Sequence, residues 1–142
     1  MSEIPPPPVP QSVSQLTRTW RNVTALSWLV LGFAILALAI SSRTVGKPTW
    51  WLGTQSQPRF IFLWVTPFLA PVASIVASLR FSRWATLVSL GSSVALAIVA
   101  VFDVHATPGI AIGEFILAGA GALITVASLA GRTTVNAYPH DR

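Results

Sequence analysis

The chain has 142 residues, of which 53% are hydrophobic and only 9% are charged, well below the roughly 25% charged residues of a soluble domain. This excludes an ordinary soluble protein and, once the apolar stretches are set aside, leaves no room for a second domain. The net charge of +5 is spread along the chain rather than gathered in one patch, which argues against nucleic acid binding, and the absence of cysteine excludes disulfides and thiolate chemistry.

The two ends of the chain are predicted to be tails. The first residues include Pro5 to Pro8 and Pro10. Consecutive prolines favour polyproline II and cannot form a helix, so residues 1–19 are predicted to be a disordered, proline-rich tail. Residues 132–142 are predicted to be a second, short tail.

Between the tails lie four stretches that carry no charge except Glu114. A helix rises 1.5 Å per residue and therefore crosses the roughly 30 Å hydrocarbon core in about 20 residues, which each stretch supplies. We predict an all-α integral membrane protein with a four-helix transmembrane bundle. Its spans are expected at about 22–41, 59–79, 84–102 and 109–130.

The first span carries small residues at seven-residue spacing, Ala25, Gly32 and Ala39, which predicts a face for helix contact. The last of them also completes a small-x-small pattern of the kind that signal peptidase cuts. Because the uncharged stretch is longer than a signal-peptide core, we expect an uncleaved helix. In the long outer loop that follows, Trp50 and Trp51 are expected either to lie flat on the membrane surface or to pack over the bundle.

The second span contains Pro67 and Pro71. Each proline removes a backbone donor and frees a carbonyl one turn earlier, so a helix kink is predicted. Almost no loop separates this span from the third, which predicts a tight antiparallel hairpin between spans two and three. The third span presents small and hydroxyl residues along one side, a pattern that favours close helix packing in lipid.

The fourth span is rich in glycine. Gly109 and Gly113 form a GxxxG pattern, and Ala118, Gly121 and Thr125 continue the small-residue face. GxxxG is frequent in membrane helices and indicates packing rather than a specific dimer. These five residues are therefore predicted to contact neighbouring helices.

Glu114 is the one ionisable residue inside a span and shares the face of that small-residue stripe. An acid in the bilayer marks a functional site by default, yet Glu114 lies near the outer end of its helix, so a structural role and a proton, cation or ligand role both stay open. It is expected to reach headgroups, water, Arg43 or Arg59. Asp103 and His105 are candidates to converge with it at the outer mouth, and Asp103 is expected to cap the turn or pair with a basic residue. Their spacing is poor for a metal, so no metal site is predicted.

The basic residues near the span ends are unevenly distributed, with six on one side and three on the other. By the positive-inside rule the richer side is cytoplasmic, which predicts a multi-pass protein of the plasma (inner) membrane with both termini in the cytoplasm. The preference for arginine over lysine is typical of GC-rich bacterial genomes. Five arginines on this side are expected to contact anionic lipid headgroups: Arg18, Arg21, Arg80, Arg83 and Arg132.

No serine has a histidine or carboxylate base nearby in the predicted topology, and no glycine-rich phosphate loop occurs, so neither an enzyme nor a bound cofactor is predicted. The small-residue faces outnumber the residues that carry chemistry. We therefore expect a non-enzymatic accessory or scaffolding subunit that packs against other membrane proteins or against itself. The alternative is a small proton- or cation-coupled transporter or channel that uses Glu114.

Overall fold

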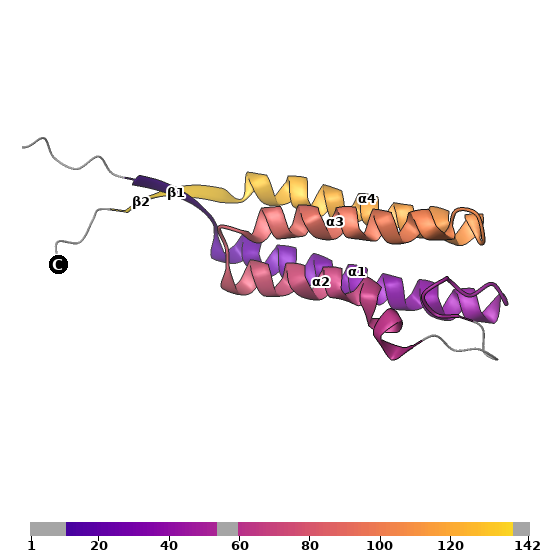
Figure 1. Cartoon of the computed structure of the whole chain (residues 1–142). Coiled ribbons are helices and arrows are strands. Elements are labelled where there is room, and N and C mark those ends of the chain that lie inside the picture. Colours follow the sequence, from indigo (N-terminus) through magenta and orange to yellow (C-terminus); the bar gives the residue numbers. More distant parts are fainter. Residues whose placement is uncertain (1–10, 54–59, 138–142) are drawn as a thin grey trace, which may run out of the picture.

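The structure is a computed structural model that describes residues 11–53 and 60–137, with side chains for residues 15–53 and 60–132. Four antiparallel helices lie side by side in an up-and-down bundle (Figure 1). They are α1 (Arg18–Thr44), α2 (Ile61–Arg80), α3 (Ala85–Asp103) and α4 (Pro108–Ala130). Each is long and apolar enough to cross a membrane, which confirms the four predicted helices. Helix α1 is longer than predicted at both ends, and Arg59, the predicted start of the second span, lies outside the described residues.

Small side chains on the inward faces let the helices approach closely. A Cβ atom added at Gly121 of α4 would lie 2.8 Å from Ser93 Oγ of α3 and 3.0 Å from the Trp28 ring of α1. Gly32 of α1 faces Pro71 of α2 less tightly, since a Cβ atom added at Gly32 would lie 3.6 Å from Pro71 Cβ, an ordinary van der Waals distance. Glycine is thus required where three helices meet, because no larger residue fits without displacing a ring.

The α4 face largely follows the prediction. Ala118, Gly121 and Thr125 are buried, and Gly113 faces a leucine of α1. Gly109 differs from the prediction, since a Cβ atom added there would meet no atom within 4 Å. The reason is its angular position, because at 3.6 residues per turn Gly109 lies opposite the buried Ala118, on the exposed side of α4.

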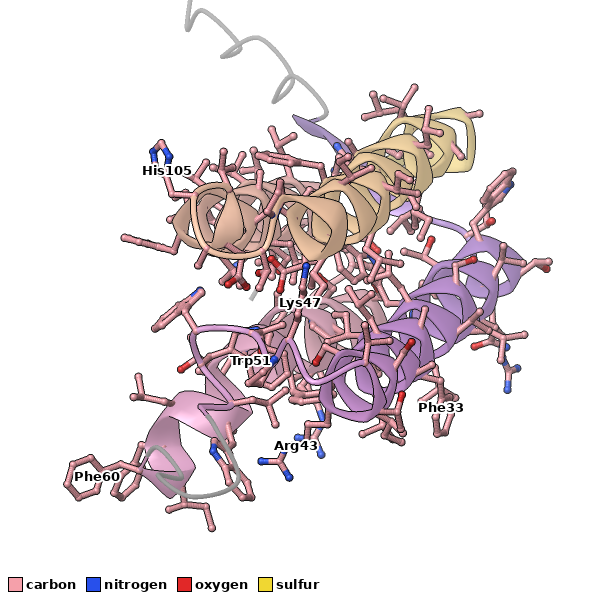
Figure 2. The ribbon with its side chains drawn as sticks, turned by 90° about the vertical axis from the view of Figure 1, so that its right-hand side faces the viewer. Phe33, Arg43, Lys47, Trp51, Phe60 and His105 are labelled. Carbon is pink, nitrogen blue, oxygen red and sulfur yellow. The ribbon has the colours of Figure 1, made fainter. Side chains whose placement is uncertain are left out.

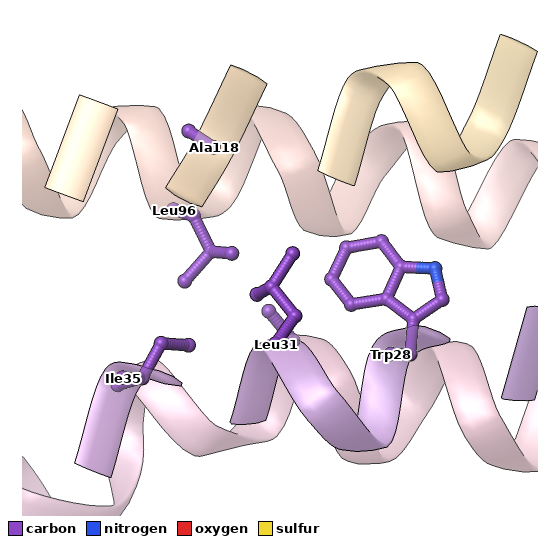
Figure 3. Close-up of a cluster of buried hydrophobic side chains, with 6 residues drawn as sticks. Trp28, Leu31, Ile35, Leu96 and Ala118 are labelled. Atoms are coloured by element: carbon purple, nitrogen blue, oxygen red, sulfur yellow. The ribbon is translucent and has the colours of Figure 1, made fainter. Parts of the chain in front are cut away.

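The middle of the bundle is apolar. Trp28, Leu31 and Ile35 of α1 meet Leu96 of α3 and Ala118 of α4 in one cluster of buried side chains (Figure 3). Trp28 is fully buried and still satisfies its indole N–H, which donates to Ser89 Oγ at 2.8 Å. Ser89 and Thr125 share a further hydroxyl contact of 2.7 Å. These bonds tie α1, α3 and α4 together on one side of the apolar cluster.

Helix α2 contains both predicted prolines, and both are buried. The first turns of α2 bend away from the axis of the rest of the helix (Figure 1). Pro67 cannot donate to the carbonyl of Leu63, so the ladder of hydrogen bonds is interrupted where the bend occurs. The kink is therefore confirmed.

The connections also follow from local sequence. Residues 81–84 form the short turn between α2 and α3, which confirms the predicted hairpin. Helix α1 ends where Gly46 adopts a positive φ of 74°. Its N–H donates to Arg43 and that of Lys47 donates to Ser42, the paired bonds of a Schellman motif. Pro48 then prevents the helix from continuing.

Both tails differ from the predicted irregular structure. Strand β1 (Gln11–Leu16) pairs antiparallel with β2 (Arg132–Ala137), in a register that sets Val13 opposite Val135. Neither segment shows a regular alternation of polar and apolar residues, so the local sequence does not predict these strands. This two-stranded β-ribbon, formed by β1 and β2, lies at one end of the bundle and pairs Gln11 with Ala137 (Figure 1). Residues 1–10 and 138–142 lie outside the described residues.

The arginines expected to contact lipid cluster at this same end of the bundle. Two of them also close helix ends: Arg21 donates to the carbonyls of Ser78 and Leu79 at the end of α2, and Arg132 donates to Thr86 Oγ1 at 2.7 Å. Arg21 lies at the C-terminus of α2, where a cation satisfies free carbonyls and complements the helix dipole, whereas Arg132 bonds a hydroxyl in the first turn of α3. These two side chains therefore support the fold whatever lipid surrounds them.

Candidate functional site

The two acids of spans three and four meet at the end of the bundle opposite the ribbon. Asp103 is the last residue of α3 and is 0% exposed, and Glu114 of α4 is 7% exposed. Glu114 lies six residues into α4, about 9 Å along the helix. Because α3 and α4 are joined by a short turn and run antiparallel, the two carboxyl groups lie close enough to interact electrostatically.

One oxygen of each carboxyl group is held by the protein. Asp103 Oδ1 accepts the backbone N–H of Trp50 at 3.0 Å and the hydroxyl of Thr107 at 3.2 Å. Glu114 Oε1 accepts the indole N–H of Trp51 at 3.3 Å. The backbone N–H of Thr107 also donates to the Asp103 carbonyl at 2.8 Å. Asp103 thus caps the turn between α3 and α4, as the sequence predicted.

The second oxygen of each group has no donor among the described residues. Asp103 Oδ2 and Glu114 Oε2 are both buried and unpartnered. Two ionised carboxylates in contact repel each other and offer only acceptors, whereas one proton between them supplies the missing donor to both. The arrangement is therefore suited to bind a single proton.

The basic residues and the histidine at this end of the bundle do not bond to the two carboxyl groups in the described part of the chain. The Arg43 guanidinium stacks over the Trp64 ring at 4.9 Å and does not join Glu114. Lys47 is exposed on the loop that covers the pair. His105 is exposed in the turn and points away from the bundle (Figure 2). The structure thus brings Asp103 and Glu114 together and places His105 apart from them, and Arg59 lies outside the described residues.

The loop between α1 and α2 packs over the bundle, the second of its two predicted arrangements. Trp51 and Leu52 are 3% and 7% exposed, and the Trp51 ring meets Phe68 of α2 edge to face at 6.2 Å. The indole N–H of Trp50 donates to the Val99 carbonyl, and that of Trp64 donates to the Leu52 carbonyl, both at 3.2 Å. Figure 2, which looks onto this end, places Trp51 between the helix ends. We call residues 49–53 the lid.

Among the spaces near the acid pair, two share a wall. Beneath the lid is a cavity of about 10 Å³, lined by Trp51 and Glu114, which is room for about one water molecule. On the outside, a groove of about 540 Å³ runs between α2 and α3. Pro67, Leu96 and Val99 line both spaces, so one layer of side chains separates the groove from the cavity.

The sequence did not predict that the lid residues donate hydrogen bonds to the two acids. The one available signal was the Asp-x-x-x-Thr spacing of Asp103 and Thr107 across the turn, which is typical of a capped connection. The contact of Trp51 with Glu114 joins residues 63 positions apart, and no local pattern encodes it.

The donor set does not favour a metal. Among residues 11–53 and 60–137, no three histidine, cysteine or carboxyl side chains gather in a cluster. Two carboxyl groups with indole and hydroxyl donors are equipped to hold a proton or a monovalent cation instead.

Comparisons with protein-family models, with curated proteins and with solved structures give no match to this chain. Function is therefore argued from the site itself.

Proposed function

We propose that this protein is a small, non-enzymatic proton-coupled transporter of the membrane, with Asp103 and Glu114 as its protonation site. The observation that carries the proposal is the contact between two buried carboxyl groups that have no basic partner among the described residues. Acidic residues inside membrane spans are costly and rare, and they often mark proton or ion pathways.

A purely structural role would not need two acids. Asparagine at position 103 and glutamine at position 114 would accept the same bonds from Trp50 and Trp51 without a buried charge. What the acids add is the ability to exchange a proton. The lid binds both carboxyl groups directly, so a change in their protonation alters the bonds that hold the lid in place.

We place the protein in the plasma (inner) membrane of a bacterium, with both chain ends in the cytoplasm. The ribbon joins the ends on the arginine-rich side of the bundle, which supports a common location for them. The acid pair then faces the exterior beneath the lid. Anionic lipid headgroups are the proposed contacts of Arg18, Arg80 and Arg83.

The test is proton flux into vesicles that contain the purified protein and a trapped pH-sensitive dye. An imposed pH gradient, with potassium and valinomycin to compensate charge, should collapse faster with the wild-type protein than with empty vesicles. Glu114→Gln should reduce the rate to that of empty vesicles while circular dichroism stays unchanged. Equal rates for wild-type protein and empty vesicles would refute the proposal.

An accessory or scaffolding subunit is the second candidate. The small-residue faces in the sequence favour this candidate less than expected, because Gly32, Gly113 and Gly121 contact helices of this same chain. Gly91 and Gly119 favour it, since both lie exposed on the bundle surface with open space around them. A membrane-protein partner or a second copy would be captured by crosslinking in native membranes, and a monomer without crosslinks would exclude this candidate.

A further inference from the structure

We propose that the groove between α2 and α3 is the binding site of a lipophilic organic cation, which enters from the bilayer and is held by the charge of the acid pair behind the groove wall. The inference rests on the proposed function and adds the substrate class. It is carried by three features: the shape of the groove, its aromatic end and its nearness to the unpartnered carboxyl groups.

The groove is large and almost wholly apolar. Its volume of about 540 Å³ falls within the range typical of small-molecule sites. Its lining includes three small residues, Ala73 of α2 and Gly91 and Ala95 of α3. All three are exposed on the bundle surface, so in a membrane the groove opens toward the lipid. An apolar body is therefore the part of a ligand that fits here.

One end of the groove carries an aromatic pair. Trp50 and Phe102 both line it, and their ring centroids lie 5.3 Å apart at 57°. The indole N–H of Trp50 is engaged by the Val99 carbonyl, so the ring has a fixed orientation. The faces of aromatic rings attract cations, and organic ammonium and phosphonium groups are recognised in this way.

The carboxyl groups of Asp103 and Glu114 lie behind the aromatic end of the groove. The backbone N–H of Trp50 donates to Asp103, which connects the aromatic pair to the carboxyl groups. Pro67, Leu96 and Val99 form the single layer between the groove and the Glu114 cavity. Negative charge acts strongly across such a short apolar layer, because little water is present to screen it.

The same arrangement couples binding to the proton. A cation in the groove is attracted when the acid pair has released its proton and is less attracted when the proton is present. Binding should therefore release one proton for each cation bound, and by linkage acid should weaken binding. This exchange needs no cofactor or oxidant.

The test uses tetraphenylphosphonium and the full-length protein in nanodiscs of neutral phosphatidylcholine, with empty nanodiscs to correct for partition into lipid. Equilibrium dialysis should detect saturable binding to the wild-type protein. Asp103→Asn with Glu114→Gln should weaken it at least tenfold. Neutral triphenylphosphine oxide should bind at least tenfold more weakly than the cation.

Gly91→Leu tests the groove itself, because the leucine side chain would project into the groove. The matched control is Gly119→Leu on α4, which is equally exposed and also has open space at its Cβ position. Gly91→Leu should weaken tetraphenylphosphonium binding at least tenfold, and Gly119→Leu should change it less than twofold. Equal effects of the two variants would overturn the groove as the site.

The remaining outcomes separate the inference from the proposed function. Infrared spectroscopy detects the stretching band of a protonated carboxyl group, which should shift when tetraphenylphosphonium binds. A pH-dependent band without cation binding would overturn the inference and leave the proton site standing. Unchanged cation binding in the Asp103→Asn, Glu114→Gln variant would also overturn the inference, because the two carboxyl groups would then not contribute to cation recognition. Absence of both the band and the binding would refute both proposals.

Discussion

Replacing Glu114 by glutamine and by alanine separates the charge of the site from its hydrogen bonding. Glutamine keeps an oxygen for the Trp51 indole and places an amide donor against Asp103, in the way that a protonated Glu114 would. The indole loses a charge-assisted bond and the core loses a buried acid, two effects of about 1 kcal/mol each and of opposite sign. We expect Glu114→Gln to unfold within about 1 kcal/mol of the wild-type protein.

Alanine removes the acceptor and leaves a void. The Trp51 indole is 3% exposed, and an unpartnered buried donor costs about 1 to 3 kcal/mol. The space left beside Leu96 and Leu117 adds to this cost, since both line the cavity under the lid. We expect Glu114→Ala to be about 2 to 4 kcal/mol less stable than Glu114→Gln.

The assay is unfolding by SDS in mixed micelles, followed by circular dichroism. Trp51→Phe is the matched partner variant, because it removes the donor and keeps an apolar ring. In the Trp51→Phe background the difference between glutamine and alanine at position 114 should shrink, as expected for two groups that contact each other. If alanine and glutamine unfold at the same SDS fraction, the lid does not seal the site from water and the reasoning fails.

Two further predictions concern the packing that holds the site in place. Gly121→Ala should destabilise the bundle by about 1 to 3 kcal/mol relative to Gly119→Ala in the same SDS assay. The reason is that a Cβ atom at position 121 meets Ser93 and the Trp28 ring, whereas a Cβ atom at position 119 meets open space. Equal stability of the two variants would contradict this close approach. Trp28→Phe should lower the free energy of unfolding by about 1 to 3 kcal/mol, because it removes the indole donor to Ser89 and leaves part of the ring volume empty. If the loss in the Trp28→Phe, Ser89→Ala double variant equals the sum of the two single losses, the bond is not formed.

The four helices and their inward faces could be read from local patterns. Length and hydropathy set the spans, and helical spacing placed Ala118, Gly121 and Thr125 on one face with Glu114, because a helix converts sequence spacing directly into geometry. The kink at the prolines and the turn between α2 and α3 are equally local. The ribbon was missed because its two strands lie at opposite ends of the chain and neither is stable without the other.

The composition of the candidate site depended on contacts that no spacing encodes. The sequence made Glu114 the leading candidate with Asp103 and His105 beside it. The fold placed only His105 away from the other two, since a turn of a few residues can point a side chain inward or outward. Lid residues Trp50 and Trp51 were recognised as aromatic but not as donors to the acids, because those bonds join segments about 50 to 60 residues apart.

The sequence by itself determined a bundle of four membrane-length helices with a single acid on the small-residue face of the last helix, since hydrophobicity and helical period act locally along the chain. Only the tertiary structure decided that this acid is paired with Asp103, covered by the lid and separated from an apolar groove by one layer of side chains. Those relations arise where three helix ends and a loop meet, and packing in three dimensions is what brings them together.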